Sequence, residues 1–561
     1  MSDVLLIRSD ASARIGTGHI MRCAAVAQGW RNAGGRVVFV HAETTLAMTR
    51  RLEADSLESV GIEAVPGSVD DAVRTAAISR ELDAAWVVAD GYAFGAPWQD
   101  AAKRAGLRLL LADDCGHAES YCADLVLNQN LHADAGLYSR RASHTRLLLG
   151  PRFVQLRREF AAWGNWNRSI PESADKVLVT LGGADPDNAT ATVLRALARL
   201  KGVETTVVVG GNNPNRAAIE GLAGSLDGVC KVLVGPENMP ELMASSDLAV
   251  SAGGSTSWEL AFMGLPTVAV AIADNQRPIV QSLVQAGCAV DAGWFQDLDE
   301  ERLAGIIGDL RQSRLAREAM SARQRRLVDG HGVRRILAAM GRSLRISVLS
   351  DEDSWINPFL SGWVTGVRGA GHAVEWIHSA RQLAQGDLAF LLSYSRIVPP
   401  ALLRLNAQNL VVHESDLPRG RGWSPLSWQV LTGADEIPVA LLEAADGVDS
   451  GPIYSQAVIR LRGNELVDEL RAAQAEATLR LCTDFTARHP FVLADARAQS
   501  GSPTYYPRRG PADSRLDPDK TLREQFQLLR IADFERYPAH FEMAGRRFAV
   551  RITAMPDEPS R

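Results

Sequence analysis

The sequence predicts an α/β protein made of doubly wound, Rossmann-like domains. Short continuous apolar runs alternate with amphipathic helical patterns over the first 340 residues. This alternation is typical of parallel strands that are buried on both faces and joined by helices. The length of 561 residues suggests three or four domains. Hydrophobic residues make up 46% and charged residues 22%, which is ordinary for a globular protein.

Two successive sets of apolar runs predict two such domains. The first set places strands at 4–7, 37–40, 86–89 and 109–112, with a helix over 20–30 after the first strand. A polar stretch rich in Trp and Asn, 163–175, precedes a second set at 177–181, 205–209, 231–234, 248–250 and 267–272. We expect domains at 1–165 and 174–340 with a cleft between them, and a nucleotide bound at the carboxyl ends of their strands.

The remaining sequence predicts a third α/β domain at 344–490 and a small C-terminal subdomain at 491–561. Strands are expected at 345–349 and 388–392, a turn over 366–371, and a final apolar–polar alternation at 548–553. No signal peptide or membrane-spanning run is evident, and the six cysteines are scattered without a C-x-x-C pair. We therefore expect a cytoplasmic protein with no membrane partner. The net charge of −6 argues against a nucleic-acid partner.

The segment from Arg8 to Arg22 is the most informative one. It follows an apolar run and precedes a helical pattern, so that Gly16 and Gly18 lie in a strand–loop–helix junction. Glycines let a ligand approach the main chain closely, and the free N–H groups at a helix start attract an anion. His19 is then a titratable base beside a phosphate site, although a histidine at a helix start is also often a cap or a packing residue. With its wider context, this junction favours an enzyme.

Two further glycine loops connect a predicted strand to a helix. The turn at 182–183 is followed by Asp187 and Asn188, either of which is a plausible N-cap. The loop at 253–255 consists of small residues whose N–H groups suit a diphosphate. One turn into the next helix, Glu259 has a carboxylate that can accept both hydroxyl groups of a ribose.

Two polar segments complete the expected first site. Asp90 and Tyr92 follow the strand at 86–89, where they either face the ligand or form a turn. The amides of Asn275 and Gln276 can bind a sugar or a phosphate, or simply satisfy the backbone.

Together with Asp113-Asp114 and 156–160, these motifs make residues 1–330 resemble the UDP-2,4-diacetamido-2,4,6-trideoxy-β-L-altropyranose hydrolases of pseudaminic acid biosynthesis. That family has two Rossmann-like domains in the GT-B arrangement. The resemblance implies inverting, metal-independent hydrolysis, with His19 as the general base that activates water and Asp10 orienting the substrate or the water. It also implies that Tyr92 and Asn275 hold the sugar and the departing phosphate, and that Arg8 and Gln276 contact the substrate. The residues that the resemblance implies for UDP binding are Gly16, Gly18, Gly182, Gly183, Gly253, Gly254, Ser255 and Glu259.

A second candidate site lies in the third domain. His413 ends an apolar run and begins a His-x-Ser-x-Leu-Pro motif, and Asp449 begins an Asp-Ser-Gly-Pro motif. A His and an Asp that meet across a cleft can move a proton, although both are also common turn residues. The two motifs resemble those of the N10-formyltetrahydrofolate-dependent formyltransferases, and the C-terminal tail resembles that of their amino-sugar members.

This second resemblance covers about 344–555 and implies formyl-folate as the formyl donor. It implies that His413 manages the proton, that Asp449 polarises the imidazole and the attacking amine, and that the segment after the strand at 388–392 lines the folate pocket (Ser393, Tyr394, Ile397). The family places an Asn two residues before the His, but this chain has Val411 there. Losing one such donor costs about 2–4 kcal/mol in an acyl-transfer site. Asn409 is on the same strand face as Val411 but lies two residues, roughly 6.5 Å, further from the turn, so we do not expect it to substitute directly. Ser415 or a backbone amide is the candidate donor.

The two halves together predict a bifunctional nucleotide-sugar enzyme. It would hydrolyse UDP from a UDP-2,4-diamido-2,4,6-trideoxyhexose and formylate the sugar's 4-amino group, toward a 7-N-formyl pseudaminic acid. Two alternatives stay open at this point: a GT-B glycosyltransferase, and a hydrolase with a non-catalytic formyltransferase-like binding module. The sequence leaves the stereochemistry of the sugar, the oligomeric state and any channelling of intermediates undetermined.

Overall fold

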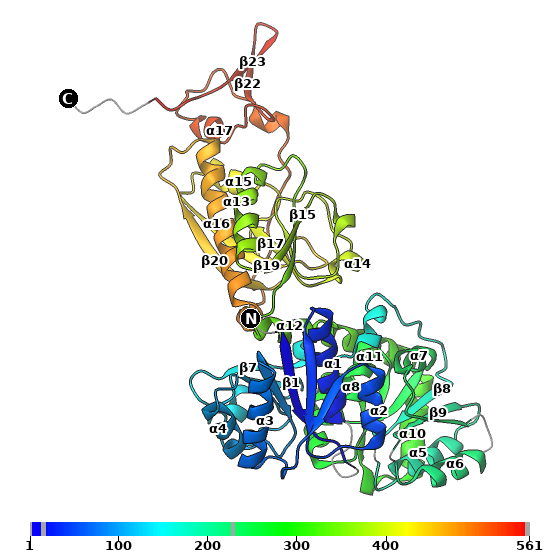
Figure 1. Cartoon of the computed structure of the whole chain (residues 1–561). Coiled ribbons are helices and arrows are strands. Elements are labelled where there is room, and N and C mark those ends of the chain that lie inside the picture. The colour runs from blue at the N-terminus through cyan, green and yellow to red at the C-terminus, as the bar shows by residue number, and fades with distance from the viewer. Residues whose placement is uncertain (1–2, 13–17, 184, 212, 226–229, 556–561) are drawn as a thin grey trace. The chain divides into compact units, whose positions relative to one another are not determined.

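The computed structural model describes residues 3–12, 18–183, 185–211, 213–225 and 230–555. The chain divides into two compact units, Met1–Met340 and Gly341–Arg561 (Figure 1). The first unit contains two parallel sheets in series, and the second contains a mixed sheet with smaller C-terminal elements. The finer domain boundaries given above remain predictions.

The first sheet has the strand order β3-β2-β1-β4-β5-β6-β7, and its strands run parallel. Its strands are β1 Val4–Ser9, β2 Arg36–His41, β3 Glu58–Gly61, β4 Trp86–Asp90, β5 Leu109–Ala112, β6 Leu125–Asn128 and β7 Arg146–Leu149. The accompanying helices are α1 Gly18–Asn32, α2 Leu46–Ala54, α3 Val69–Glu81 and α4 Ala96–Arg104, with 3-10 turns η1 Ala135–Tyr138, η2 Pro151–Phe153 and η3 Arg158–Trp163.

The second sheet repeats this topology with the order β10-β9-β8-β11-β12-β13, again parallel. Its strands are β8 Lys176–Thr180, β9 Glu204–Val209, β10 Cys230–Val234, β11 Leu248–Ala252, β12 Thr267–Ala271 and β13 Val290–Trp294. Its helical elements are α5 Ala189–Ala198, α6 Arg216–Ser225, α7 Met239–Ser245, α8 Thr256–Phe262, η4 Asp274–Gln276, α9 Arg277–Gln285, η5 Phe295–Asp297, α10 Glu300–Gln312, α11 Arg314–Leu327 and α12 Gly332–Ala339.

The strand order determines where a ligand is expected. In each parallel sheet the chain starts in the middle, builds one side, and then crosses to the other, so that β1 lies beside β4 and β8 beside β11. At such a switch point the following loops diverge and leave room at the carboxyl ends of the strands. Helix α12 returns to pack on α1, with Val333 seated against Gly29, and so joins the second half of the unit to the first.

The second unit is built on the sheet β15-β14-β16-β17-β19-β20, in which β19 and β20 run antiparallel to their neighbours. Its strands are β14 Arg345–Leu349, β15 Ala373–Ile377, β16 Gly386–Leu391, β17 Asn406–His413, β19 Glu436–Glu443 and β20 Ile453–Arg460. The two small pairs are β18 Arg421–Gly422 with β21 Tyr505–Tyr506, and β22 Ala539–Met543 with β23 Arg546–Val550. Its helical elements are α13 Asn357–Gly369, η6 Ala380–Gln382, α14 Pro400–Leu403, α15 Pro425–Leu431, α16 Val467–Arg488, η7 Phe491–Asp495, η8 Pro511–Ser514 and α17 Phe526–Arg530.

The predicted α/β class and the tandem Rossmann-like arrangement are confirmed by this topology. The turn expected over 366–371 is wrong for 366–369, which belong to α13, and is confirmed only for Ala370 and Gly371. That helix forms despite its glycines since Leu360, Val364 and Val367 are buried, and tertiary packing of an apolar face outweighs intrinsic propensity. Within the described ranges, none of the helices combines the length and the apolarity that crossing a bilayer needs.

The capping of α5 also differs from the expectation. Asn188 occupies the N-cap position, but its side chain makes no capping hydrogen bond. Asp185 caps the helix instead, because its two carboxylate oxygens accept from the backbone N–H groups of Ala189 and Thr190, each at 2.9 Å. The first free amides of this helix are therefore already occupied by a carboxylate of the chain.

Candidate active sites

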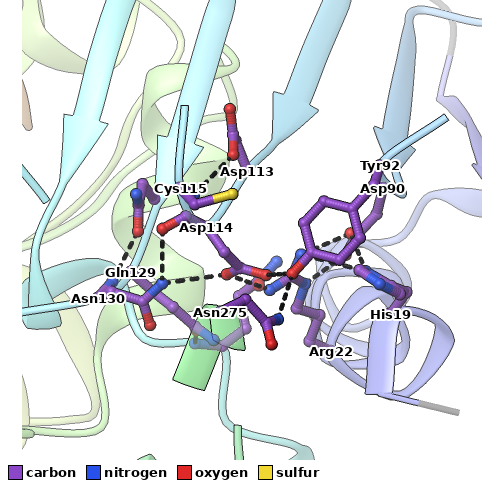
Figure 2. Close-up of polar contacts among 12 residues, drawn as sticks. His19, Arg22, Asp90, Tyr92, Asp113, Asp114, Cys115, Gln129, Asn130 and Asn275 are labelled. Atoms are coloured by element: carbon purple, nitrogen blue, oxygen red, sulfur yellow. Dashed lines mark hydrogen bonds and ion pairs between the residues drawn. The ribbon is translucent and has the colours of Figure 1, made fainter. Parts of the chain in front are cut away.

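His19 and Asp90 form a hydrogen-bonded pair at the switch point of the first sheet. His19 lies in the first turn of α1, and Asp90 is the last residue of β4, where it aligns with Ser9 of β1. The His19 Nδ1 atom lies 2.7 Å from Asp90 Oδ1 (Figure 2). An ionised carboxylate only accepts, so Nδ1 carries a proton, and in the neutral ring the lone pair is then on Nε2. This is the tautomer that a general base requires.

Arg22 connects this pair to a second carboxylate. One helical turn after His19, its Nε and Nη2 donate to the two oxygens of Asp90 at 2.5 and 2.6 Å, and its Nη1 donates to Asp114 Oδ1 at 2.6 Å. Burial alone would raise the pKa of Asp90, but Arg22 and His19 outweigh burial and hold the pKa well below its ordinary value. Asp90 therefore stays ionised. Arg22 is not among the predicted site residues, and Asp90 is predicted only to face the ligand or form a turn, not to pair with His19.

Tyr92 and Asn275 bring the two halves of the first unit together. The Tyr92 hydroxyl donates to Asp114 Oδ2 at 3.1 Å and accepts from Asn275 Nδ2 at 2.7 Å. The Tyr92 ring also stands edge-on to the His19 ring, with centroids 5.2 Å apart. Burial and the Asp114 carboxylate raise the pKa of Tyr92, so it remains a neutral donor. Three residues predicted separately, from the loop after β4, from α1 and from η4, thus meet around one point (Figure 2).

Polar groups also follow β5 and β6. Asp113 accepts from Tyr121 Oη at 2.5 Å and pairs with His117 at 3.2 Å. Burial raises the pKa of Asp113, but these two contacts outweigh burial and lower the pKa to about 2. Asn130 Nδ2 donates to Asp114 Oδ1 at 3.1 Å. The carboxyl ends of β4, β5 and β6 therefore supply one continuous network, as the parallel topology requires.

One of the predicted UDP loops, the one before α8, comes close to the start of α1. A Cβ on Gly18 would lie 4.0 Å from Ser255 Oγ, so the start of α1 and the loop before α8 face each other across the two halves. Gly253 has no room for a side chain, since a Cβ would meet Val280 at 2.6 Å, and Gly254 lies against the Gln276 amide. Gln276 Oε1 itself accepts from the backbone of Ile272 at 3.2 Å.

The other predicted UDP residues show mixed surroundings. Gly182 adopts a positive φ of 89° after β8 and is exposed, as a glycine turn allows. Gly183 packs directly on Gly210, which has no space for a Cβ. Gly16 lies outside the described residues. Glu259 forms a buried ion pair with Arg157, whose Nη2 donates to Oε1 at 2.9 Å.

Arg8 and Asp10 are surrounded by protein groups. The Arg8 guanidinium is fully buried and donates to both oxygens of Asp71 at 2.9 and 2.7 Å and to Asp10 at 2.7 Å. Asp10 also accepts from the backbone of Ala42 and Glu43 at 2.7 and 3.0 Å. These contacts fix the β1 and β2 ends, so a direct contact of Arg8 or Asp10 with substrate stays a prediction.

The second unit has a cavity of about 670 Å³ that contains the second predicted site. All the residues predicted for formyl transfer line it: His413, Asp449, Ser393, Tyr394 and Ile397. The volume lies within the range typical of small-molecule sites. Several arginines and aromatic residues complete the wall: Trp355, Arg396, Trp423, Arg508, Arg509 and Tyr537.

His413 is held between two acceptors. Its Nε2 donates to the carbonyl oxygen of Gly420 at 2.7 Å, and its Nδ1 lies 3.4 Å from Asp449 Oδ2. Asp449 has a positive φ of 49° and accepts from the backbone N–H of Gly422 at 2.9 Å. The imidazole is therefore oriented on both sides. A proton on Nδ1 can pass to Asp449 without breaking the hydrogen bond from Nε2 to Gly420.

Val411 lines the same cavity and offers no hydrogen-bond donor. Asn409 does not replace it, since it is not part of the cavity wall and its Nδ2 donates to Leu403 O at 2.8 Å. Ser415 is 2% exposed and is likewise absent from the wall. Glu414, which sequence reasoning missed, does line the cavity, and burial raises the pKa of its carboxyl.

Known protein families match parts of both units. Residues 177–335 match the glycosyltransferase family 28 C-terminal domain, and residues 367–483 match the formyl transferase family. The chain joins a glycosyltransferase-28-like part to a formyltransferase-like part. Among the residues that the structure describes, no three His, Cys, Asp or Glu side chains gather as metal ligands would.

Two curated relatives agree with this division. The N-terminal part is similar to the spore coat polysaccharide biosynthesis protein SpsG of Bacillus subtilis, with 25% identity over 221 residues, 39% of this chain and 64% of that protein. The methionyl-tRNA formyltransferase of Leifsonia xyli is 29% identical over 179 residues, 30% of this chain and 57% of that protein. The chain therefore spans less than two thirds of the length of either relative.

Solved structures resemble larger parts of the chain at lower identity. MurG of Acinetobacter baumannii has a TM-score of 0.43 and 18% identity, and covers 60% of this chain and 99% of its own. A 4-N formyltransferase from Francisella tularensis has a TM-score of 0.31 and 16% identity, and covers 37% of this chain and 97% of its own. At TM-scores this low, the fold is judged from the sheet topology itself.

Proposed function

We propose that this protein is a bifunctional enzyme of nucleotide-sugar metabolism. The second unit transfers a formyl group to the 4-amino nitrogen of a UDP-linked 4-amino sugar, and the first unit hydrolyses the UDP-2,4-diamido-2,4,6-trideoxyhexose that results. The observation that carries the hydrolysis is the His19–Asp90 hydrogen bond of 2.7 Å, which leaves Nε2 as a base at the switch point of the sheet.

In the proposed hydrolysis a water molecule attacks the anomeric carbon. His19 Nε2 takes the proton of the water, the bond from oxygen to C1 forms, and the bond from C1 to the β-phosphate oxygen breaks, so that UDP leaves with the electron pair. Attack opposite the leaving group inverts the configuration at C1. Asp90 keeps the ring in this tautomer and stabilises the imidazolium that forms.

The charges around His19 support this assignment. Arg22 is a single cation between Asp90 and Asp114, so this cluster carries an excess negative charge. Such a charge stabilises the positive charge that develops at an anomeric carbon during glycosidic cleavage, but it disfavours a phosphate at the same place. We therefore assign the sugar to the network of Figure 2 and the diphosphate to the predicted glycine loops, of which the one before α8 comes close to the start of α1.

The residues of the second cavity fit a formyl-folate. Its size and its polar and aromatic wall suit a ligand of this class, and N10-formyltetrahydrofolate supplies the formyl group when it is bound. His413 and Asp449, whose Nδ1 and Oδ2 lie 3.4 Å apart, would take the proton that the attacking amine loses as its nitrogen bonds to the formyl carbon. Tetrahydrofolate would leave with a proton on N10 as the bond from that nitrogen to the formyl carbon breaks. Arg508 and Arg509 supply positive charge for the anionic parts of the ligands.

The deciding experiment incubates the full-length chain with a UDP-linked 4-amino sugar, with and without formyl-folate. We expect formyl-folate to add the mass of one formyl group to the sugar, and the formylated UDP-sugar to release UDP with water as the acceptor. UDP release that requires a hydroxyl acceptor would instead make the first unit a glycosyltransferase. Absence of both formyl transfer and folate binding would leave the second unit without its proposed role.

A further inference from the structure

The ion pair between Arg157 and Glu259 joins the two halves of the first unit. Arg157 immediately precedes η3, in the segment that follows the first sheet, and Glu259 lies in α8 of the second sheet. Arg157 Nε and Nη2 both donate to Glu259 Oε1, at 3.2 and 2.9 Å. Both side chains are largely buried, with 9% and 15% exposed. Such a pair can be displaced only by moving the two halves or by breaking a buried interaction.

Further contacts fix the orientation of the guanidinium. Arg157 Nη1 pairs with Glu159 Oε1 at 2.8 Å, and the guanidinium lies 5.7 Å from the Phe160 ring centroid. The guanidinium thus contacts two carboxylates, Glu159 and Glu259. Its two donors toward Glu259, Nε and Nη2, both bind Oε1. Among the residues that the structure describes, no donor is placed on Oε2 of Glu259, and the side chain as a whole is 15% exposed.

A buried carboxylate needs this cation to remain an acceptor. Burial raises the pKa of Glu259, and Arg157 opposes that shift. Without Arg157 the carboxyl would protonate more readily and would turn freely, since no other contact to its oxygens is present in the described part of the chain. A protonated, mobile carboxyl is a poor partner for a ribose hydroxyl, which donates best to a fixed, ionised oxygen.

We propose that Arg157 is a positioning residue for the nucleotide, which holds Glu259 Oε1 and so directs Oε2 toward a hydroxyl group of the ribose. This inference rests on the proposed function, because it assumes that the first unit binds UDP. It adds that recognition of the ribose depends on both halves at once, since the carboxylate comes from the second sheet and the residue that orients it follows the first.

The test measures binding of UDP and of 2′,3′-dideoxy-UDP to the full-length protein by titration calorimetry. The variants are E259Q, R157A, R157K and the double variant R157A/E259Q. R158A is the matched control, because the neighbouring Arg158 side chain is 55% exposed and its Nη2 only approaches Asp55 at 3.4 Å. Thermal unfolding of each variant shows whether it is folded at the titration temperature.

We expect E259Q and R157A each to weaken UDP binding by roughly tenfold to a hundredfold, as for a lost hydrogen bond to a charged group. Both variants should change the affinity for dideoxy-UDP little. The UDP affinity of the double variant should be no lower than that of either single variant, and R158A should bind UDP as the wild type does. R157K, which keeps the charge but not the fork, should retain part of the preference for UDP.

Three results would overturn the inference. One is an equal loss of UDP and dideoxy-UDP affinity in R157A or R157K, which is what a merely structural role predicts. Another is additive losses in the double variant, and the third is unchanged UDP affinity in R157A. If the wild type binds neither nucleotide, the proposed function itself fails, which distinguishes that failure from the failure of Arg157 alone.

Discussion

Replacing Asp90 by Asn tests whether His19 acts as a base whose tautomer is fixed by its neighbour. Asp90 serves two partners, since Oδ1 accepts from His19 Nδ1 at 2.7 Å and both oxygens accept from Arg22. An amide keeps the shape but turns one acceptor into a donor. If its NH₂ faces His19, the ring must present a lone pair at Nδ1 and carry its proton on Nε2. If the NH₂ faces Arg22, two donors meet.

The size of the effect follows from these two outcomes. In a comparable histidine–aspartate pair the wrong tautomer lowers kcat roughly 10⁴-fold, which corresponds to about 5 kcal/mol of transition-state stabilisation. Arg22 retains Asp114, whose Oδ1 lies 2.6 Å from Nη1, so the guanidinium is not left unpaired. We therefore expect a loss of about 1–3 kcal/mol in the free energy of unfolding and a fall in kcat of roughly 10³- to 10⁴-fold.

The assay is UDP release from the UDP-sugar by D90N in the full-length chain, with UDP affinity measured alongside. D70N is the matched control, because Asp70 is exposed and its carboxylate accepts only from Arg74 Nε at 2.7 Å within the described contacts. UDP affinity should stay within a few-fold, since the predicted diphosphate loops do not include Asp90. A folded D90N variant that keeps wild-type turnover would refute the assignment of His19 as an Asp-oriented base.

Three further predictions address both units. His19→Ala should lose most UDP release while UDP affinity survives, and turnover equal to the wild type would remove His19 from the mechanism. Val411→Asn should raise formyl transfer at least roughly tenfold, because it restores a side-chain donor worth about 2–4 kcal/mol; the rate of formyl-sugar formation checks this, and an unchanged rate would show that another group already serves. The pKa values of Asp90 and Asp113 lie below their ordinary value of 3.8, so their contribution to folding stability is complete above about pH 5 and is lost as the pH falls from about 4 toward 2. Urea unfolding across that range should show the decline, with D90N losing less than the wild type.

The tandem Rossmann-like fold was accessible from sequence because its buried strands are continuous apolar runs. Strand β3 was missed for the opposite reason, since Glu58–Gly61 is an edge strand whose residues are mostly exposed. The glycine-containing helix α13 was read as a turn at its end because local propensity says nothing of the sheet that buries its apolar face. Elements that depend on tertiary packing therefore escaped a reading of local pattern.

The candidate site divides in the same way. His19, Tyr92 and Asn275 each stand in a recognisable motif, but the partners that give them chemistry are distant in sequence: Asp90 lies 71 residues from His19, and Asn275 lies 183 residues from Tyr92. The strand order, which puts β1 beside β4, brings His19 to Asp90, and the packing of the two halves of the first unit brings Asn275 to Tyr92. Arg22 could have been found, because a basic residue one turn after a histidine shares its helix face.

The two sites differ in how fully the chain supplies their hydrogen bonds. In the first, the base has a fixed tautomer, its carboxylate is held ionised, and the network continues through Arg22 to Asp114. In the second, both nitrogens of His413 already face protein oxygens, and Val411 contributes no donor. Hydrolysis is therefore expected to be the faster of the two activities. If both act on one nucleotide sugar, formyl transfer must come first or the hydrolase will remove its substrate; pulse experiments that quench at early times should then show the formylated UDP-sugar before any free formylated sugar.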